Sequence, residues 1–352
     1  MQKVLVALSG GVDSSVAAAL LVEQGFEVIG ATMRLWSVPG GEQENRCCTP
    51  ETRALAPRLA DKLNIPFIVL DETENFRKIV VRQFLEGYAR GETPNPCVTC
   101  NRFLKWGALW DYAKSIGADY LATGHYARVL TGHEGLFELW KGQDPGKDQT
   151  YFLSMLTQEQ LAHTLFPLGE LRKSDVRRIA QERGLPAADQ PESQDLCFLG
   201  ERDYRAFLAE YAPETVQPGP ITDRGGKVLG RHQGLAFYTI GQRKGLPAAA
   251  QALYVWQKDT QNNRLVVCPA EELGTDSLRA VDINWISGSA PTDEFQTEVK
   301  IRFRAAPASA VARPEPDGGA LVRFAKPLRD ITPGQLAVFY RGERVLGGGW
   351  IS

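Results

Sequence analysis

The sequence KVLVALSGGVDSS, residues 3–15, joins a short apolar run to a glycine turn and the start of a helix. The run Lys3–Leu8 is typical of a strand buried on both faces, and the Ala- and Leu-rich stretch Ser14–Glu23 is typical of a helix. Gly10 and Gly11 let the backbone turn tightly and approach a ligand closely. Because the next helix points its free N–H groups and positive dipole end at this turn, the loop suits a pyrophosphate.

Asp13 is the unusual member of this loop, because its carboxylate would repel a phosphate unless it holds Mg²⁺ or a backbone turn. The loop has neither the Gly-Lys-Ser/Thr of the Walker pattern nor the GxGxxG of dinucleotide-binding turns. A plain strand–helix turn with a Ser or Asp cap is the simpler interpretation, but two adjacent glycines within SGGVDSS disfavour it. The loop resembles that of the pyrophosphatase-loop (PP-loop) family, which cleaves ATP, adenylates a substrate oxygen and releases pyrophosphate.

The first half of the chain alternates strand and helix patterns, which predicts a parallel sheet covered by helices. Right-handed crossovers would place the ligand crevice beyond the carboxyl ends of the strands. The further expected strands are Glu27–Met33, Pro66–Leu70 and Asp119–Thr123, and the expected helices are Thr52–Leu63, Phe76–Arg90 and Trp106–Ile116.

The pattern changes near residue 200. A helix is expected over Tyr204–Tyr211 and a linker over the proline-rich Pro213–Pro220. Short strand-like runs follow and favour two small β-barrel domains, with a Pro/Ala/Gly-rich loop over Pro307–Gly319. We therefore expect an α/β catalytic domain over residues 1–202, a central β-rich domain over 203–272 and a C-terminal β-barrel over 273–352. The expected strands are Leu235–Ile240, Ala252–Gln257, Arg264–Cys268, Thr297–Phe303, Ala320–Phe324 and Gln335–Tyr340.

Composition excludes several classes of protein. The 352 residues are 43% hydrophobic and 23% charged, which excludes wholesale disorder, and the net charge of -2 argues against binding nucleic acid through bulk charge. Two acid-free stretches, Arg224–Lys258 and Val299–Pro314, combine basic and aromatic residues, as a phosphate-backbone surface does, although solvated strands would look the same. No apolar run reaches the ~20 residues that span a bilayer, so we expect a cytoplasmic protein without a membrane partner.

The cysteines form a second signal. Six in this length are too few for a disulfide scaffold. Cys97 and Cys100 form a CxxC pair within TPNPCVTCNR, which is compatible with a redox pair, half a zinc site or part of an iron–sulfur site. Cys197, in ESQDLCF, lies far along the chain, and a lone cysteine of this kind is more often a buried apolar residue. We interpret the remaining Cys47, Cys48 and Cys268 as spectators.

Three more strings carry polar residues. ATGHYAR, residues 122–128, follows an expected strand, and KDQTYFL, residues 147–153, places a cation, an anion and an amide before apolar residues. GRHQG, residues 230–234, is followed by YTIGQRKGL, residues 238–246, and both are rich in glycine and basic residues. Taken singly, these strings can be a strand-end turn, a helix N-terminus and a hairpin turn.

The ordered set of these strings, together with TPGQLAVFY at residues 332–340, resembles the tRNA-specific 2-thiouridylases. The resemblance implies an adenine nucleotide alpha hydrolase-like PP-loop domain followed by two β domains that help to hold tRNA. It also implies a reaction: ATP, with Mg²⁺, adenylates the C2 oxygen of the wobble uridine of Lys, Glu or Gln tRNA, and a persulfide sulfur then attacks C2. AMP and pyrophosphate are released. A cysteine desulfurase or a sulfur-carrier protein would donate the sulfur.

The resemblance also implies roles for individual residues. Cys197 would bear the persulfide, and Cys100 would help to release the sulfur and leave a Cys100–Cys197 disulfide. Because a disulfide needs Cα atoms within ~7 Å, a segment around one cysteine is expected to move when tRNA binds. The implied ATP contacts are Ala7, Leu8, Ser9, Gly10, Gly11, Val12, Asp13, Ser14, Met33 and Gly124. The implied contacts with tRNA or the target base are Asn95, Pro96, Cys97, His125, Lys147, Asp148, Gln149, Arg302, Phe303 and Gln335.

Two departures from the family pattern leave alternatives open. Many relatives carry Asp where this chain has Cys97, and Phe303 stands where Tyr is common. Cys97, Cys100 and Cys197 could instead bind a [4Fe–4S] cluster whose open iron holds sulfide. An ATP-dependent synthetase acting on a small molecule would share the PP-loop without needing the cysteines, and a pure RNA-binding module would not need the intact loop.

Overall fold

A parallel sheet forms the N-terminal part of the molecule, as expected from the alternating patterns. The computed structural model describes residues 1–36, 50–191, 196–199 and 202–352. The strand order is β3-β2-β1-β4-β7, with every neighbouring pair parallel. The strands are β1 (Lys3–Ala7), β2 (Glu27–Arg34), β3 (Phe67–Asp71), β4 (Tyr120–Ala122) and β7 (Thr164–Leu165).

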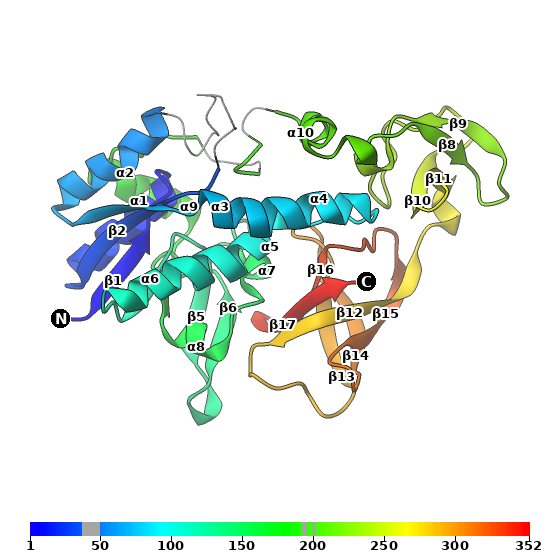
Figure 1. The fold of residues 1–352 in the computed structure, drawn as a ribbon. Coiled ribbons are helices and arrows are strands. Elements are labelled where there is room, and N and C mark those ends of the chain that lie inside the picture. Colours follow the sequence, from blue (N-terminus) through cyan, green and yellow to red (C-terminus); the bar gives the residue numbers. More distant parts are fainter. Residues whose placement is uncertain (37–49, 192–195, 200–201) are drawn as a thin grey trace.

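Helices cover both faces of this sheet (Figure 1). On one face Val4, Val6 and Val28 pack in a common core with the helices α1, α2 and α9. On the other face Leu5 and Leu121 pack against the helical run that ends in α6. The sheet is therefore the middle of three layers, which explains its continuous apolar strands. The bounds are α1 (Val12–Glu23), α2 (Pro50–Leu63), α9 (Lys173–Glu182) and α6 (Trp110–Ser115).

Two long helical runs contain π-helical segments, in which the backbone bonds i→i+5. The first joins α3 (Thr73–Phe76), η2 (Arg77–Val81) and α4 (Arg82–Ala89), close to the expected helix. The second joins α5 (Pro96–Cys100), η3 (Asn101–Leu109) and α6. It begins ten residues before the expected Trp106, because Pro96 fits the first helical turn, where no N–H is needed. The CxxC pair therefore lies on a helix.

The C-terminal strands close into a barrel, and a hairpin from the N-terminal part adds two strands to its sheet. Six strands run in the order β12-β15-β14-β13-β16-β17, and β12 also pairs with β17. The hairpin β5–β6, which the sequence patterns did not predict, continues this sheet from β17. The bounds are β5 (Ala127–Thr131), β6 (Phe137–Lys141), β12 (Thr275–Trp285), β13 (Phe295–Lys300), β14 (Ala308–Pro314), β15 (Ala320–Leu328), β16 (Leu336–Arg341) and β17 (Arg344–Ile351).

The expected loop over Pro307–Gly319 is wrong, because most of it is β14. Ala310 and Ala312 alternate with exposed or half-buried neighbours and face the barrel core, where small side chains fit. The expected strand over Leu235–Ile240 is also wrong. Its first three residues form the 3₁₀ turn η6 (Leu235–Phe237), in which Leu235 and Ala236 are buried and Phe237 is half-buried without strand pairing.

The central part carries a four-stranded sheet of order β10-β11-β8-β9, reached through the expected helix α10 (Tyr204–Tyr211). The expected linker lacks sheet structure up to Pro218, and its last two residues begin β8 at Gly219. Among the residues that the structure describes, no helix is long and apolar enough to cross a membrane. The strands are β8 (Gly219–Thr222), β9 (Val228–His232), β10 (Leu253–Asp259) and β11 (Arg264–Pro269).

Candidate active site

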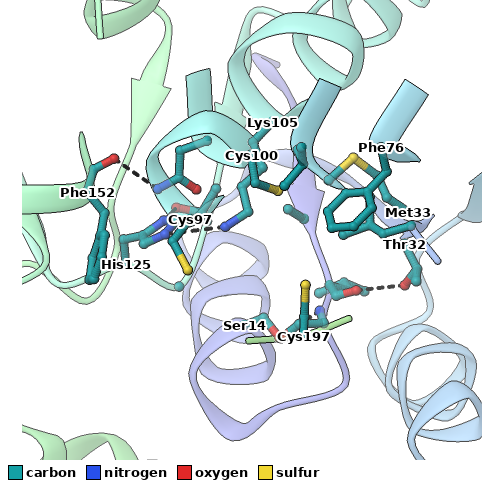
Figure 2. Close-up of a pocket in the computed structure, with 18 of the residues that line it drawn as sticks. Ser14, Thr32, Met33, Phe76, Cys97, Cys100, Lys105, His125, Phe152 and Cys197 are labelled. Carbon is teal, nitrogen blue, oxygen red and sulfur yellow. Dashed lines mark hydrogen bonds between the residues drawn. The ribbon is translucent and has the colours of Figure 1, made fainter. Parts of the chain in front are cut away.

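A pocket of ≈ 400 Å³ opens at the carboxyl ends of β1, β2 and β4, where a parallel sheet is expected to bind its ligand (Figure 2). The PP-loop lies on one side and the CxxC helix on another. The segment around Cys197 completes the wall, so Cys197 lines the same cavity as Cys97 and Cys100 although it lies 97 positions after Cys100. The residues that line the pocket include Ser9, Asp13, Ser14, Met33, Cys97, Cys100, Lys105, Thr123, Gly124, His125, Gln149, Cys197 and Phe198.

The PP-loop is built to leave backbone N–H groups free. Gly11 is the N-cap of α1 and supplies no side-chain cap, so the first-turn amides have no side-chain acceptor there. The hydroxyls of Ser14 and Ser15 both donate to the Gly11 carbonyl, at 3.1 and 2.9 Å, which holds the turn closed. A Cβ at Gly124 would lie 2.7 Å from the Ser14 nitrogen, so only glycine lets this strand end pack on the loop. The geometry suits a pyrophosphate or nucleotide phosphate.

The carboxylate of Asp13 is neutralised in a way that the sequence did not predict. Lys173 Nζ lies 2.6 and 2.8 Å from its two oxygens, and the Tyr126 hydroxyl donates to it at 2.8 Å. The Lys173 side chain is only 11% exposed. The expectation that only Mg²⁺ or a backbone turn would reconcile this carboxylate with a phosphate is therefore corrected. Lys173 was missed because it comes from the start of α9, 160 positions along the chain.

The three cysteines differ in exposure. Cys97 is exposed, Cys100 is buried and Cys197 is half-buried, and none of the three forms a disulfide in the structure. Burial raises the pKa of the Cys100 thiol, and the nearby Lys105 ammonium opposes that rise. Figure 2 shows Cys197 pointing toward the helix that carries Cys100. Cys268 lies instead in β11, away from this pocket.

The cluster alternative can be tested against this geometry. An iron–sulfur cluster needs several thiolates on one small group of metal atoms. Across the described ranges, no group of three or more Cys, His, Asp or Glu side chains is close enough to hold a metal ion. The three thiols thus share a cavity without forming a ligand set. Cys47, Cys48 and the residues Glu192–Asp195 lie outside the described residues.

Aromatic rings anchor the segment that carries Cys197. The ring of Phe198 is 3% exposed. It lies 5.1 Å from the ring of Phe84 and 5.9 Å from that of Phe76, both on the α3–α4 run. It also lies 5.2 Å from Phe207 of α10 and 6.5 Å from Trp36. Phe198, the residue after Cys197, therefore holds this segment against the α3–α4 run and α10.

The ATGHYAR string places its histidine inside the pocket wall. Thr123 Oγ1 lies 2.6 Å from His125 Nδ1, and Lys105 Nζ lies 3.4 Å from His125 Nε2. Burial and Lys105 together lower the pKa of His125 well below its usual range, so the imidazole is neutral. Because an ammonium can only donate, Nε2 accepts and Nδ1–H donates to the threonine. Lys105, in the string NRFLKW, is a second residue that the sequence analysis missed.

Two expected tRNA contacts, Gln335 and Arg302, do not line the main pocket, and Gln335 supports the loop before the CxxC pair. Gln335 Nε2 donates to the Thr93 carbonyl at 2.7 Å. Arg302 donates to the Ile240 carbonyl at 2.9 Å and also bonds Thr332, so it ties the C-terminal barrel to the central part.

The remaining expected contacts are spread over the same region. Asp148 is buried and accepts from the hydroxyl and backbone N–H of Thr150, and Lys147 precedes it. Phe303 packs on Phe152, with ring centroids 4.4 Å apart. Asn95 lines a second cavity of ≈ 190 Å³ between the CxxC helix and the barrel. Pro96, Cys97, His125 and Gln149 line the main pocket, with Ala7, Leu8, Ser9, Asp13, Ser14, Met33 and Gly124 of the expected ATP set. Gly10, Gly11 and Val12 form the turn behind them.

Three family models match this chain in succession. A "tRNA methyl transferase HUP domain" matches residues 2–201, a "tRNA methyl transferase PRC-barrel domain" residues 205–269, and an "Aminomethyltransferase beta-barrel domain" residues 275–351. Similar full-length proteins carry the name tRNA-specific 2-thiouridylase MnmA. That of Magnetococcus marinus is 49% identical and covers 99% of each chain. That of Chloroflexus aurantiacus is 47% identical and covers 100% of this chain and 99% of its own.

Proposed function

The chain belongs to the family of tRNA-specific 2-thiouridylases, and from that premise we propose that it thiolates C2 of the tRNA wobble uridine at the pocket described above. It is a tRNA sulfurtransferase that uses ATP. The observation that carries the proposal is that the PP-loop and the cysteines Cys97, Cys100 and Cys197 line one cavity. ATP chemistry and sulfur chemistry can then act on one base.

The first step activates the uridine. Its C2 oxygen is a poor leaving group, so the oxygen attacks the α-phosphate of ATP and pyrophosphate leaves. The uncapped amides at the start of α1 hold the phosphates, and Lys173 neutralises Asp13 beside them. The new bond makes the C2 oxygen part of a leaving AMP. Mg²⁺ would accompany the nucleotide and share its charge.

The second step transfers sulfur. A persulfide on Cys197 attacks C2, a C–S bond forms, and the C2–O bond breaks as AMP leaves. The Cys100 thiolate then attacks Cys197 Sγ, the S–S bond to the transferred sulfur breaks, and its electron pair stays with the sulfur on C2. The products are 2-thiouridine and a Cys100–Cys197 disulfide, which an external thiol reductant resets. The persulfide sulfur comes from a cysteine desulfurase or a sulfur-carrier protein.

The target base has to leave its stack to reach this cavity. Cys97 and Pro96 at the pocket wall, and Asn95 beside it, are proposed to meet the base, with His125 and Gln149 deeper in the wall. The central and C-terminal parts, proposed as residues 203–272 and 273–352 after a catalytic domain of 1–202, would hold the tRNA body. Lysine, glutamate and glutamine tRNAs are the proposed substrates. A cluster mechanism is less well supported, because the described cysteines form no ligand set.

A reconstituted reaction tests the proposal. The full chain is mixed with ATP, a cysteine desulfurase, cysteine and a tRNA transcript bearing a wobble uridine, and 2-thiouridine is measured by mass spectrometry. We expect thiolation that is lost with Cys100→Ser and Cys197→Ser, kept with Cys268→Ser, and absent from a transcript with cytidine at the wobble position. Pyrophosphate release that needs neither tRNA nor the two cysteines would instead indicate a small-molecule synthetase.

A further inference from the structure

The charges of the main pocket do not cancel. Among its described lining residues, Asp13 and Lys105 are the acidic and basic side chains that carry a full charge. Asp13 is compensated by Lys173, which lies behind it. Lys105 has no carboxylate within ion-pair distance in the part of the chain that the structure describes, and its hydrogen-bond partner is the neutral His125. The cavity therefore presents a positive charge that suits an anionic ligand.

Lys105 is also held in place. Its Nζ donates to His125 Nε2, and Thr123 fixes the other ring nitrogen. The imidazole packs against the rings of Trp106 and Phe166, with ring centroids 5.7 and 6.1 Å apart. Figure 2 shows Lys105 reaching from the CxxC helix to His125, with Ser14 and Cys197 on the far side of the pocket. A neutral, buried acceptor orients the ammonium without cancelling its charge.

The reaction brings an anion to this place. The terminal phosphates of ATP occupy the PP-loop amides, so the α-phosphate lies farther out, toward the uridine oxygen that attacks it. The α-phosphate also has to lie near the sulfur of Cys197. It leaves C2 of the uridine as part of AMP, and C2 is the atom that the sulfur attacks. Lys105 and His125 line the same pocket across from Ser14 and Cys197, so a phosphate held between the loop and Cys197 faces the ammonium.

Resting on the function proposed above, we propose that Lys105 is a catalytic residue that binds the α-phosphate of ATP and then of the adenylated uridine, with His125 as its positioning residue. As the C2–O bond breaks, the electron pair goes to the oxygen of the departing AMP. The ammonium stabilises that charge. A tRNA backbone phosphate offers the same chemistry, and the experiment separates the two sources.

Binding measurements on the full chain test this assignment without turnover. AMP, adenosine, pyrophosphate and a tRNA transcript are titrated separately by calorimetry into wild type, Lys105→Met, Lys105→Arg and the control Lys114→Met. Lys114 lies on the same helical run but pairs with Asp111 at the surface. We expect Lys105→Met to weaken AMP binding by on the order of ten- to a hundredfold, the loss of one charge-assisted hydrogen bond, and to leave adenosine and pyrophosphate unchanged. Lys105→Arg should recover most of the affinity.

Three results would overturn the assignment. One is unchanged AMP affinity in Lys105→Met. Another is a loss of tRNA affinity with AMP binding intact, which would indicate a backbone phosphate. The third is an equal loss of affinity for adenosine, which would indicate a disturbed pocket. Thermal melts of the Met and Arg variants check whether the fold is disturbed. Failure of the proposed function is seen separately, because it would abolish wild-type thiolation while leaving the AMP measurement readable.

Discussion

Replacing Phe198 by alanine removes the ring that anchors the Cys197 segment. The ring is 3% exposed and contacts the rings of Trp36, Phe76, Phe84 and Phe207. Truncating a buried phenylalanine costs about 3–5 kcal/mol. Edge-to-face ring pairs add about 0.5–1.5 kcal/mol each beyond the buried area. Phe198→Leu loses these ring pairs but keeps a buried apolar side chain, so it should lose less stability than Phe198→Ala.

The cost should fall on docking of the segment rather than on the whole domain. The anchor belongs to the short described stretch 196–199, and the parallel sheet has separate cores. A loss of about 3–5 kcal/mol lowers a docking equilibrium by about two to three and a half powers of ten, since about 1.4 kcal/mol is tenfold. If the docked segment is nearly fully populated in the wild type, part of that loss is hidden. We expect Cys100–Cys197 disulfide formation and thiolation to slow by at least about tenfold.

The assay follows disulfide formation between Cys100 and Cys197 after addition of a mild oxidant, by peptide mass spectrometry, alongside thiolation and a thermal melt. Phe103→Ala is the matched control, because that ring is 43% exposed on the neighbouring helix. Wild-type rates in Phe198→Ala would refute the anchoring argument. So would equal slowing in the control, because the effect would then not come from the buried ring.

Three further predictions concern other sites. Lys173→Met leaves Asp13 uncompensated beside the phosphates, so tRNA-dependent pyrophosphate release should fall by about ten- to a hundredfold, with Lys173→Arg less affected; an unchanged rate contradicts this. Protein purified without oxygen should lack iron and acid-labile sulfide, and Cys97→Ala should retain thiolation; a [4Fe–4S] spectrum in the wild type that is lost in the variant would retire the persulfide route. Burial lowers the pKa of Lys258, which donates to the Glu92 carbonyl, from 10.5 to about 8. Between these values the unfolded chain binds more protons, so stability should rise with pH by at most about 3 kcal/mol, and Lys258→Met should flatten that rise in melts at pH 7.5 and 9.5; parallel slopes would contradict it.

Local patterns predicted the parallel sheet well. Apolar runs and the glycine turn after β1 depend on neighbours a few positions away, so spacing alone reveals them. The hairpin β5–β6 was missed because, although its strands pair with each other, it joins a larger sheet only through the pairing of β6 with β17, more than 200 positions later. β14 was missed because its inward side chains are alanines, which look like loop residues until the barrel surrounds them.

The amino-acid sequence by itself determined the chemistry available to this protein: a loop for phosphate, a CxxC pair, a distant third cysteine and two basic, acid-free stretches in the β-rich part. Only the tertiary structure decided how these groups act together. It brought Lys173 to Asp13, placed His125 within hydrogen-bond distance of Lys105 and placed Cys197 in the cavity that Cys100 lines. The physical reason is that charge compensation and cavity walls depend on distance in space. Residues 160 positions apart meet only when the sheet and its helices pack.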